Sequence, residues 1–277
     1  ALERAVSQGQ PAEAELQKLL EAAAKAREAD PENADALNRT ARAYWRLAEH
    51  YQRTGGDPVP PIQQAVAASE RILKAHPQDS QANFHMGSAL SRLAEVESLR
   101  GADPESSYRG AIEHLGRSLE AEPDHPFVLN NLGLAYWRRG QHRMGVGQDP
   151  TEDLERAAHY LQRASSVLLA PVISQNRGNV HTTQAMYEQE HGKDPTASLE
   201  KAVQAYEAAL KLNPKEAVVW SNLASAQFLL GERAYETGGD PRPHLKEAEA
   251  SCLKATGLNP KYASGYNNLS NVRQLLG

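Results

Sequence analysis

The sequence predicts an all-α fold, a solenoid of repeated helix pairs, and three observations carry that prediction. A Gly-x-Asp-Pro turn occurs five times, with its prolines 46, 46, 45 and 46 residues apart. A second series of prolines falls between these turns at a similar spacing. Between the two sets of breaks Ala, Leu, Glu, Gln and Arg dominate, and no sustained alternation of apolar and polar residues occurs, which favours helices over strands.

Each Gly-x-Asp-Pro turn is expected to end one helix and begin the next. Gly adopts the left-handed conformation that ends helices, Asp accepts hydrogen bonds from the free N–H groups of the following helix, and Pro suits that helix's first position. The complete turns are residues 55–58, 101–104, 147–150, 192–195 and 238–241, and residues 9–11 form a degenerate sixth.

The second proline series divides every repeat into two helices. Its members are Pro31, Pro77, Pro123, Pro171, Pro214 and Pro260. The first helix of a repeat should span about 20 residues and the second about 18. The repeats are then 32–77, 78–123, 124–169, 170–214 and 215–260, with partial repeats at 1–31 and 261–277, in one solenoid over 1–277.

Composition argues against nucleic acid and membranes as partners. The 277 residues carry a net charge of −5 without a Lys/Arg run, which argues against nucleic acid. No apolar stretch approaches the roughly 18 residues of a membrane span, so no membrane is expected. The single cysteine, Cys252, cannot form an internal disulfide, and a cytoplasmic location is expected. Because the chain begins without Met and ends within a helical pattern, we expect a segment of a longer protein.

Small residues within the helices point to one class of helical repeat. In the second helices, two small or apolar residues lie seven positions apart, and the later one lies five positions before the Pro. Ala202, Ala209 and Pro214 are an example. First helices read "LNNLGLAY" at 129–136 and "WSNLASAQ" at 220–227. Over nearly its whole length the chain thus resembles the tetratricopeptide repeat (TPR) family. The resemblance implies a right-handed superhelical solenoid of antiparallel helix pairs.

The repeat length departs from that family, whose period is about 34 residues. The surplus lies around the Gly-x-Asp-Pro turn, so both helices of each pair are expected to be prolonged. HEAT-type repeats have a similar length and are the structural alternative, although they do not predict the Ala, Ala, Pro spacing. The lengthened repeats also resemble those appended to bacterial multidomain serine/threonine kinases, which implies a regulatory region of a larger bacterial protein.

A row of polar residues precedes the Leu-Gly-type pair in successive first helices. The resemblance implies that first helices line the concave groove. An Asn amide offers the donor and the acceptor that one peptide unit needs. We call the four asparagines the asparagine ladder: Asn131, Asn176, Asn222 and Asn268, preceded at the same position by Arg39 and His85. The ladder is similar to that of O-linked N-acetylglucosamine transferase, where asparagines hold a peptide backbone; the alternative is that Asn merely suits a solvated groove.

Arginines form a second row two turns further along the first helices. Arg46, Arg92 and Arg138 recur at 46 residues, and Arg39 and Arg42 add to them in the first complete repeat. A basic groove in an acidic protein implies an acidic or phosphorylated peptide. The alternative is that these arginines form ion pairs along the helices with carboxylates such as Glu49 and Glu95.

The expected function is therefore non-catalytic: a scaffold for protein–protein interaction that binds an extended peptide segment of a partner in its concave groove. The ten histidines contain no His-x-x-x-His pair, and no Gly-rich phosphate loop follows a strand. No catalytic residue, cofactor or metal is predicted. The alternative function is a structural spacer or self-assembly element that stacks on a second copy through its open repeat ends.

Overall fold

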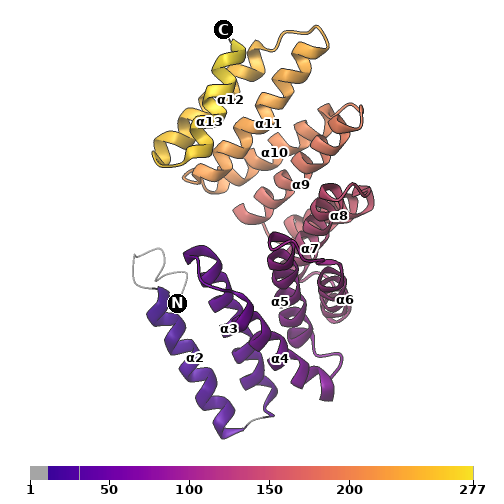
Figure 1. The fold of residues 1–277 in the computed structure, drawn as a ribbon, viewed down its shortest axis with the longest axis vertical. Helices are drawn as coiled ribbons and strands as arrows, with labels where there is room; N and C mark the ends of the chain where they lie inside the picture. The colour runs from indigo at the N-terminus through magenta and orange to yellow at the C-terminus, as the bar shows by residue number, and fades with distance from the viewer. Residues whose placement is uncertain (1–11, 31, 277) are drawn as a thin grey trace. The chain divides into compact units, whose positions relative to one another are not determined.

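The structure, a computed structural model, describes residues 12–30 and 32–276. These residues form α-helices and no strand, which confirms the all-α prediction (Figure 1). The helices are α2 (Ala12–Ala29), α3 (Ala34–Thr54), α4 (Val59–Ala75), α5 (Ser80–Leu99), α6 (Glu105–Ala121), α7 (Pro126–Gly145), α8 (Thr151–Val167), α9 (Pro171–Glu190), α10 (Thr196–Leu212), α11 (Ala217–Glu236), α12 (Arg242–Leu258) and α13 (Ala263–Leu276). The chain forms two compact units, Ala1–Arg139 and Gly140–Gly277, and α7 contains the boundary between them.

The helix lengths agree with the two proline series. The first helices α5, α7, α9 and α11 each have 20 residues and α3 has 21. The second helices α4, α6, α8, α10 and α12 each have 17 residues. The predicted lengths of about 20 and about 18 are therefore close, because glycine and proline interrupt helices by local geometry alone.

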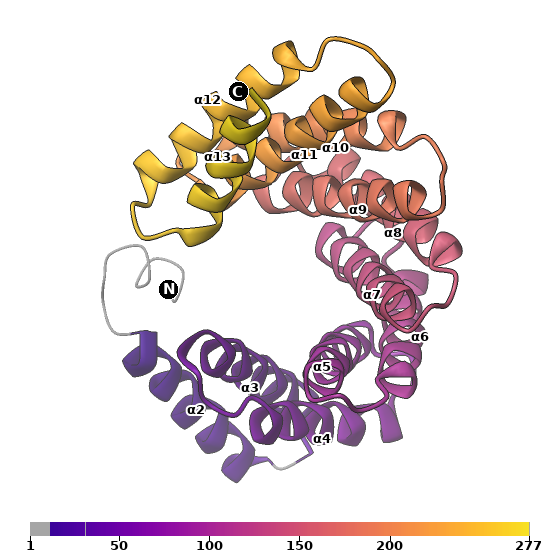
Figure 2. The ribbon, with the colours of Figure 1, turned by 45° about the horizontal axis from the view of Figure 1, so that its top comes forward.

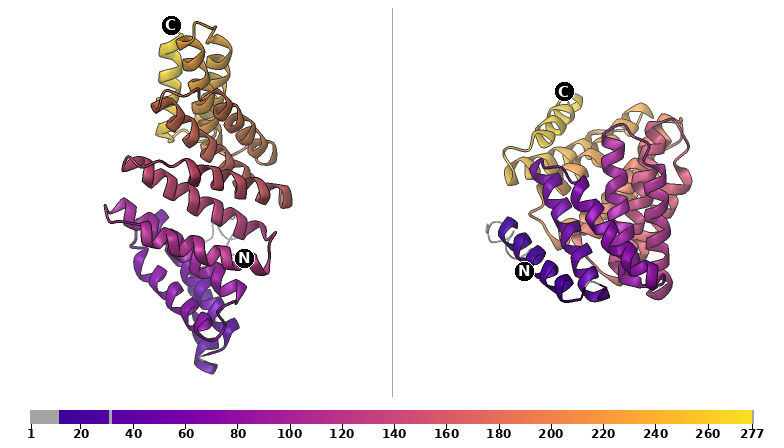
Figure 3. Two further views of the ribbon diagram at one scale, coloured as in Figure 1. Left: turned by 90° about the vertical axis from the view of Figure 1, so that its right-hand side faces the viewer. Right: turned by 60° about the horizontal axis from the view of Figure 1, so that its bottom comes forward.

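Within each unit, a first helix packs on the second helix that follows it. In the first unit α3 packs on α4 and α5 on α6, and in the second unit α9 packs on α10 and α11 on α12 (Figure 3). Successive first helices also contact one another, as in α3 with α5 and α11 with α13 (Figure 2). Among the described residues, the second helices α4 and α6, or α10 and α12, make no such contact. The first helices therefore form the inner face of each unit.

The five turn glycines end their helices as the sequence predicts. Their φ angles are 83°, 74°, 75°, 68° and 77° for Gly55, Gly101, Gly147, Gly192 and Gly238. The N–H that follows each glycine returns to a carbonyl five residues earlier, as in Gln148 N to Arg143 O at 2.8 Å. This bond satisfies a carbonyl that the helix end would otherwise leave free, in the Schellman arrangement.

The turn aspartates cap the next helix, and they also tie neighbouring repeats together. Each Asp Oδ1 accepts a bond from the N–H two residues later, at 3.0, 3.0, 2.9, 3.2 and 3.1 Å along the chain. In addition, Arg100 NH2 donates to Asp57 Oδ1 at 2.8 Å, from the end of the following first helix. The bond from the Val59 N–H, followed by that from Arg100, lowers the pKa of Asp57 below its usual 3.8.

Small residues in the middle of the first helices match the size of the residues that face them. A Cβ on Gly87 would lie 2.6 Å from Leu115 Cγ, and one on Gly178 would lie 2.6 Å from Tyr206 Cδ1. Glycine is therefore required where the facing side chain is large. Two other pairs have alanine on the first helix and a small residue in the same register of the second: Ala41 with Ser69, and Ala224 with Cys252.

The prediction of one continuous solenoid over 1–277 stays a prediction, as do its repeat boundaries. Pro31, at the end of the partial repeat 1–31, and the degenerate turn at 9–11 lie outside the described residues.

Candidate functional site

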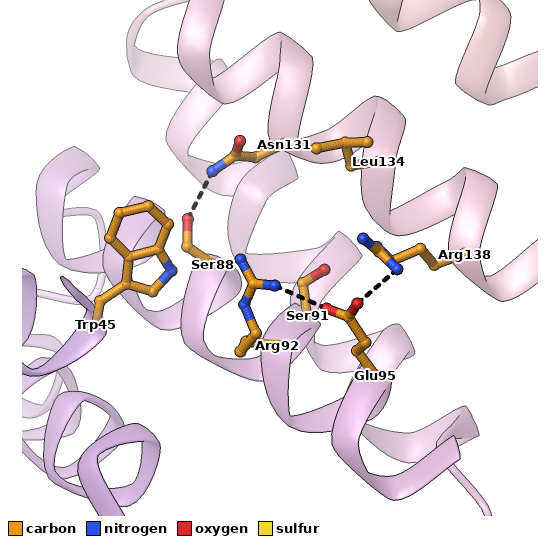
Figure 4. A pocket seen from close by; sticks show the side chains of 8 residues that line it. All are labelled: Trp45, Ser88, Ser91, Arg92, Glu95, Asn131, Leu134 and Arg138. Carbon is orange, nitrogen blue, oxygen red and sulfur yellow. Dashed lines mark hydrogen bonds and ion pairs between the residues drawn. The ribbon is translucent and has the colours of Figure 1, made fainter. Parts of the chain in front are cut away.

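A pocket opens on the inner face of the first unit, and three successive first helices supply all its side chains. We call it the Trp45 pocket (Figure 4). Its lining residues are Trp45 from α3, Ser88, Ser91, Arg92 and Glu95 from α5, and Asn131, Leu134 and Arg138 from α7. Trp45, Ser91 and Trp137 occupy the same position 46 residues apart. Ser91 therefore leaves space where the neighbouring repeats carry a tryptophan.

One carboxylate is shared by two guanidinium groups beside this pocket. Glu95 Oε2 lies 2.8 Å from Arg92 NH1, and its Oε1 lies 2.7 Å from Arg138 NH1. Arg92 NH1 also donates to Gln52 Oε1 at 2.7 Å. The Glu95 side chain is only 16% exposed, whereas those of Arg92 and Arg138 are 22% and 32% exposed. Two positive charges and one negative charge leave this group with a net charge of +1.

Hydrogen-bond donors dominate the pocket surface. Among the described residues, Nε and NH2 of both Arg92 and Arg138 have no hydrogen-bond partner. The Trp45 indole N–H also lacks one within that part of the chain, and its nitrogen points into the pocket (Figure 4). Ser88 Oγ accepts from Asn131 Nδ2 at 3.0 Å, so the hydroxyl hydrogen of Ser88 can still be donated. The pocket is thus suited to a ligand with several acceptors.

The remaining arginines of the predicted row lie elsewhere on the same helices. Arg46 pairs with Glu49 at 3.3 Å and stacks over the Trp45 ring at 5.2 Å from its centroid. Arg39 pairs with Asp35 at 2.7 Å with both side chains more than two thirds exposed, and Arg42 is exposed. The ion pairs weighed as the alternative are therefore present at Glu49 and Glu95. Only Arg92 and Arg138 come together in the pocket.

The asparagine ladder joins successive first helices through its amide nitrogens. Asn131 Nδ2 donates to Ser88 Oγ at 3.0 Å, and Asn222 Nδ2 donates to Asn179 Oδ1 at 3.1 Å. Asn268 Nδ2 donates to the carbonyl oxygen of Ser221 and to the hydroxyls of Ser221 and Ser225, at 3.2, 3.0 and 2.9 Å. Asn176 is buried, 8% exposed. The fold itself therefore uses the donor groups.

The amide oxygens of the ladder differ in what they leave available. Asn131 Oδ1 accepts from Asn130 Nδ2 at 3.2 Å. In the described residues, the oxygens of Asn222 and Asn268 accept no hydrogen bond. These two oxygens can accept from the N–H groups of an added chain. At the corresponding position of α5, burial first and the Arg42 charge second lower the pKa of His85 to about 4, so this ring is neutral at pH 7.

Apolar side chains are exposed one helical turn before the ladder. Phe127, Val172 and Val218 are 55%, 52% and 42% exposed, on α7, α9 and α11. Phe127 in the first unit, and Val172 and Val218 in the second, are each available to contact a ligand on their own unit.

Sequence reasoning did not find the Trp45 pocket as a unit. Trp45, Ser88, Ser91 and Glu95 were not singled out as ligand contacts. The signal that could have found them is the Trp, Ser, Trp series at a spacing of 46, which marks a small residue between two large ones. Glu95 was noted only as an ion-pair partner of the arginines.

Over residues 12–30 and 32–276, no group of three or more His, Cys, Asp or Glu side chains is arranged to hold a metal ion. No helix in that part of the chain combines the length and apolar character needed to cross a bilayer.

The chain is similar to tetratricopeptide-repeat proteins both in one stretch of sequence and in fold. A family model described as "Tetratricopeptide repeat" matches residues 196–216, which are α10 and the loop that follows it. The structure of TTC0263, described as a thermophilic TPR protein in Thermus thermophilus, superposes with a TM-score of 0.51 at 20% identity. This match covers 84% of this chain and 99% of that chain. The fold is that of tetratricopeptide-repeat proteins, and residues 196–216 match one repeat of that family.

Other solved structures have a similar fold. MamA 41-end from Desulfovibrio magneticus RS-1 gives a TM-score of 0.51 at 15% identity, over 81% of this chain and 97% of that chain. YrrB, described as a TPR protein with an unusual peptide-binding site, gives 0.49 at 16% identity, over 89% and 96%. None of the curated proteins compared with the chain matches its sequence. At such identities TTC0263 and MamA bear on the fold alone.

Proposed function

We propose that this chain is a tetratricopeptide-repeat scaffold, non-catalytic and devoted to protein–protein interaction. In this proposal it binds an extended peptide segment along the inner face of its first helices. The observation that carries the proposal is the Trp45 pocket, because three successive first helices supply every side chain that lines it. Solenoid proteins use such faces to contact extended partners.

The dimensions of the face suit a short extended segment. Successive helices that pack on one another are about 8–10 Å apart. The first helices α3, α5 and α7 therefore span roughly 20 Å, which corresponds to about six residues of extended chain. A peptide of that length would meet the Trp45 pocket and the exposed Phe127 ring on the same set of helices.

Hydrogen bonds to the peptide backbone alone would not give micromolar affinity. A hydrogen bond contributes about 1 kcal/mol net, whereas micromolar affinity corresponds to about 8 kcal/mol. The ladder has a limited capacity for such bonds because its amide nitrogens already bond to neighbouring helices. Side-chain contacts in the Trp45 pocket and at Phe127 must supply most of the affinity.

Filling the pocket tests this proposal. Random nine-residue peptides are selected by display on the immobilised chain, and the affinities of recovered peptides are measured by fluorescence anisotropy. Ser91→Trp places in α5 the residue that neighbouring repeats carry at this position, so the fold should persist while binding weakens at least tenfold. Ser106→Trp adds the same group to an exposed position of the second helix α6 and serves as the control. Equal affinity of both variants for every selected peptide would refute the proposal.

Several finer expectations stay predictions. They are the role of the four ladder asparagines in binding a peptide backbone, the likeness to kinase-appended repeats and the cytoplasmic location.

A further inference from the structure

The charge of the Trp45 pocket restricts the chemistry of its ligand. Arg92 and Arg138 are both held by Glu95, so three charged groups sum to +1. Arg46 and Glu49, on α3, pair with each other. A guest with one negative charge would neutralise the group.

The donors of the pocket favour a carboxylate. A carboxylate only accepts hydrogen bonds, and a guanidinium group can donate two parallel bonds to it. Nε and NH2 of each arginine remain without a partner among the described residues, as does the Trp45 indole N–H. Figure 4 shows the Arg92 guanidinium between the Trp45 ring and Glu95, at the centre of the pocket. A side-chain amide would place an NH2 group among these donors and leave some of them unsatisfied.

A phosphate group suits this pocket less well. Phosphoserine carries a charge of about −1.5 to −2 at neutral pH. It would exceed the available +1 and lie beside the Glu95 carboxylate, whose side chain is largely shielded from solvent. Like charges at short distance in a partly buried place repel strongly because solvent screens them less.

We infer that the Trp45 pocket selects one Asp or Glu side chain of the bound peptide over a neutral or phosphorylated residue, with Glu95 setting that preference. This inference rests on the proposed function, since it names the side chain that the inner face recognises. Arg92 and Arg138 would contact the carboxylate, and the Trp45 indole N–H would donate to it or to an adjacent carbonyl group.

Three peptide libraries test the inference. Each contains nine-residue peptides with eight random positions and a fixed fifth residue, which is Glu, Gln or phosphoserine. Recovery on the immobilised chain should rank Glu first, at least tenfold above Gln, with phosphoserine below Glu. Glu95→Gln raises the charge of the pocket by one, so phosphoserine should rise to equal or exceed Glu. Arg138→Gln should remove the preference for Glu over Gln.

A matched control separates pocket charge from total charge. Arg117→Gln removes one positive charge from an exposed ion pair on the second helix α6 and should leave the ranking unchanged. Circular dichroism establishes that each variant is folded. If Glu95→Gln does not fold, Arg92→Gln provides a second test, because loss of this pocket arginine should also remove the preference for Glu over Gln. Equal recovery of Glu and Gln, or phosphoserine ranked first on the native chain, would overturn the inference while peptide binding stands. Recovery of no peptide would overturn the proposed function as well.

Discussion

The contact between Gly87 and Leu115 gives a quantitative test of how the helix pairs pack. In Gly87→Ala, the added Cβ would lie 2.6 Å from Leu115 Cγ and 2.9 Å from the carbonyl oxygen of Ala111. Carbon atoms prefer a separation of about 3.5–4.0 Å, and the Ala111 oxygen belongs to the backbone, so α5 and α6 must move apart. Overpacking of this kind costs about 1–3 kcal/mol. Alanine recovers about 0.5–1 kcal/mol through its helix propensity.

We therefore expect Gly87→Ala to lower the free energy of unfolding by up to about 2.5 kcal/mol, with a central value of about 1 kcal/mol. The matched control is Gly116→Ala on α6, because a Cβ there would meet no atom within 4 Å. This second variant should raise the free energy of unfolding by about 0.5–1 kcal/mol. Urea unfolding followed by circular dichroism measures both changes. If Gly87→Ala is as stable as Gly116→Ala, the described packing of α5 on α6 is wrong.

Three further predictions concern ionisable groups. Arg143→Gln should cost about 3 kcal/mol in urea unfolding, because it removes an ion pair from the Asp153 carboxylate, which is 1% exposed. Arg100→Gln, which removes the exposed pair with Asp57, should cost under about 1 kcal/mol, and similar costs for the two variants would contradict this. The NMR titration of His85 should have its midpoint near pH 4, because burial disfavours the charged ring, and a midpoint near 6.5 would contradict the described burial. The Asp149 carboxyl has its pKa lowered below 3.8, first by a hydrogen bond from a neighbouring hydroxyl. Its contribution to stability is therefore complete above about pH 5 and is lost as the pH falls through the folded pKa. Asp149→Asn should reduce the loss of stability between about pH 6 and about pH 3, and an unchanged pH profile would exclude this role.

The sequence predicts the turns and helix lengths well because the responsible interactions are local. Gly147 has a positive φ and Asp149 caps the helix that begins two residues later, both within one five-residue stretch. No knowledge of neighbouring helices is needed to expect either feature. The same holds for the glycine at 87, although its partner Leu115 becomes evident only when α5 and α6 are packed.

Contacts between repeats follow an offset that the repeat period does not reveal. Equivalent positions lie 46 residues apart, yet Asn131 bonds to Ser88 and Arg138 to Glu95, which are 43 residues away. The difference of three residues is about one helical turn, and it arises from how successive first helices lie against each other. Without that offset, sequence reasoning treats the ladder amides as free to bind a peptide, and the sharing of Glu95 by two arginines goes unnoticed. The Trp45 pocket depends on three helices at once and was missed for the same reason.

The indole N–H signals in the NMR spectrum test the central claim most directly. The chain has three tryptophans, and Trp→Phe variants assign their signals. The indole nitrogen of Trp45 points into the pocket, whereas that of Trp220 already donates to the carbonyl oxygen of Pro214 at 2.9 Å. Addition of a selected peptide should shift the Trp45 signal saturably and leave the Trp220 signal in place. A stationary Trp45 signal with the peptide fully bound would contradict the account.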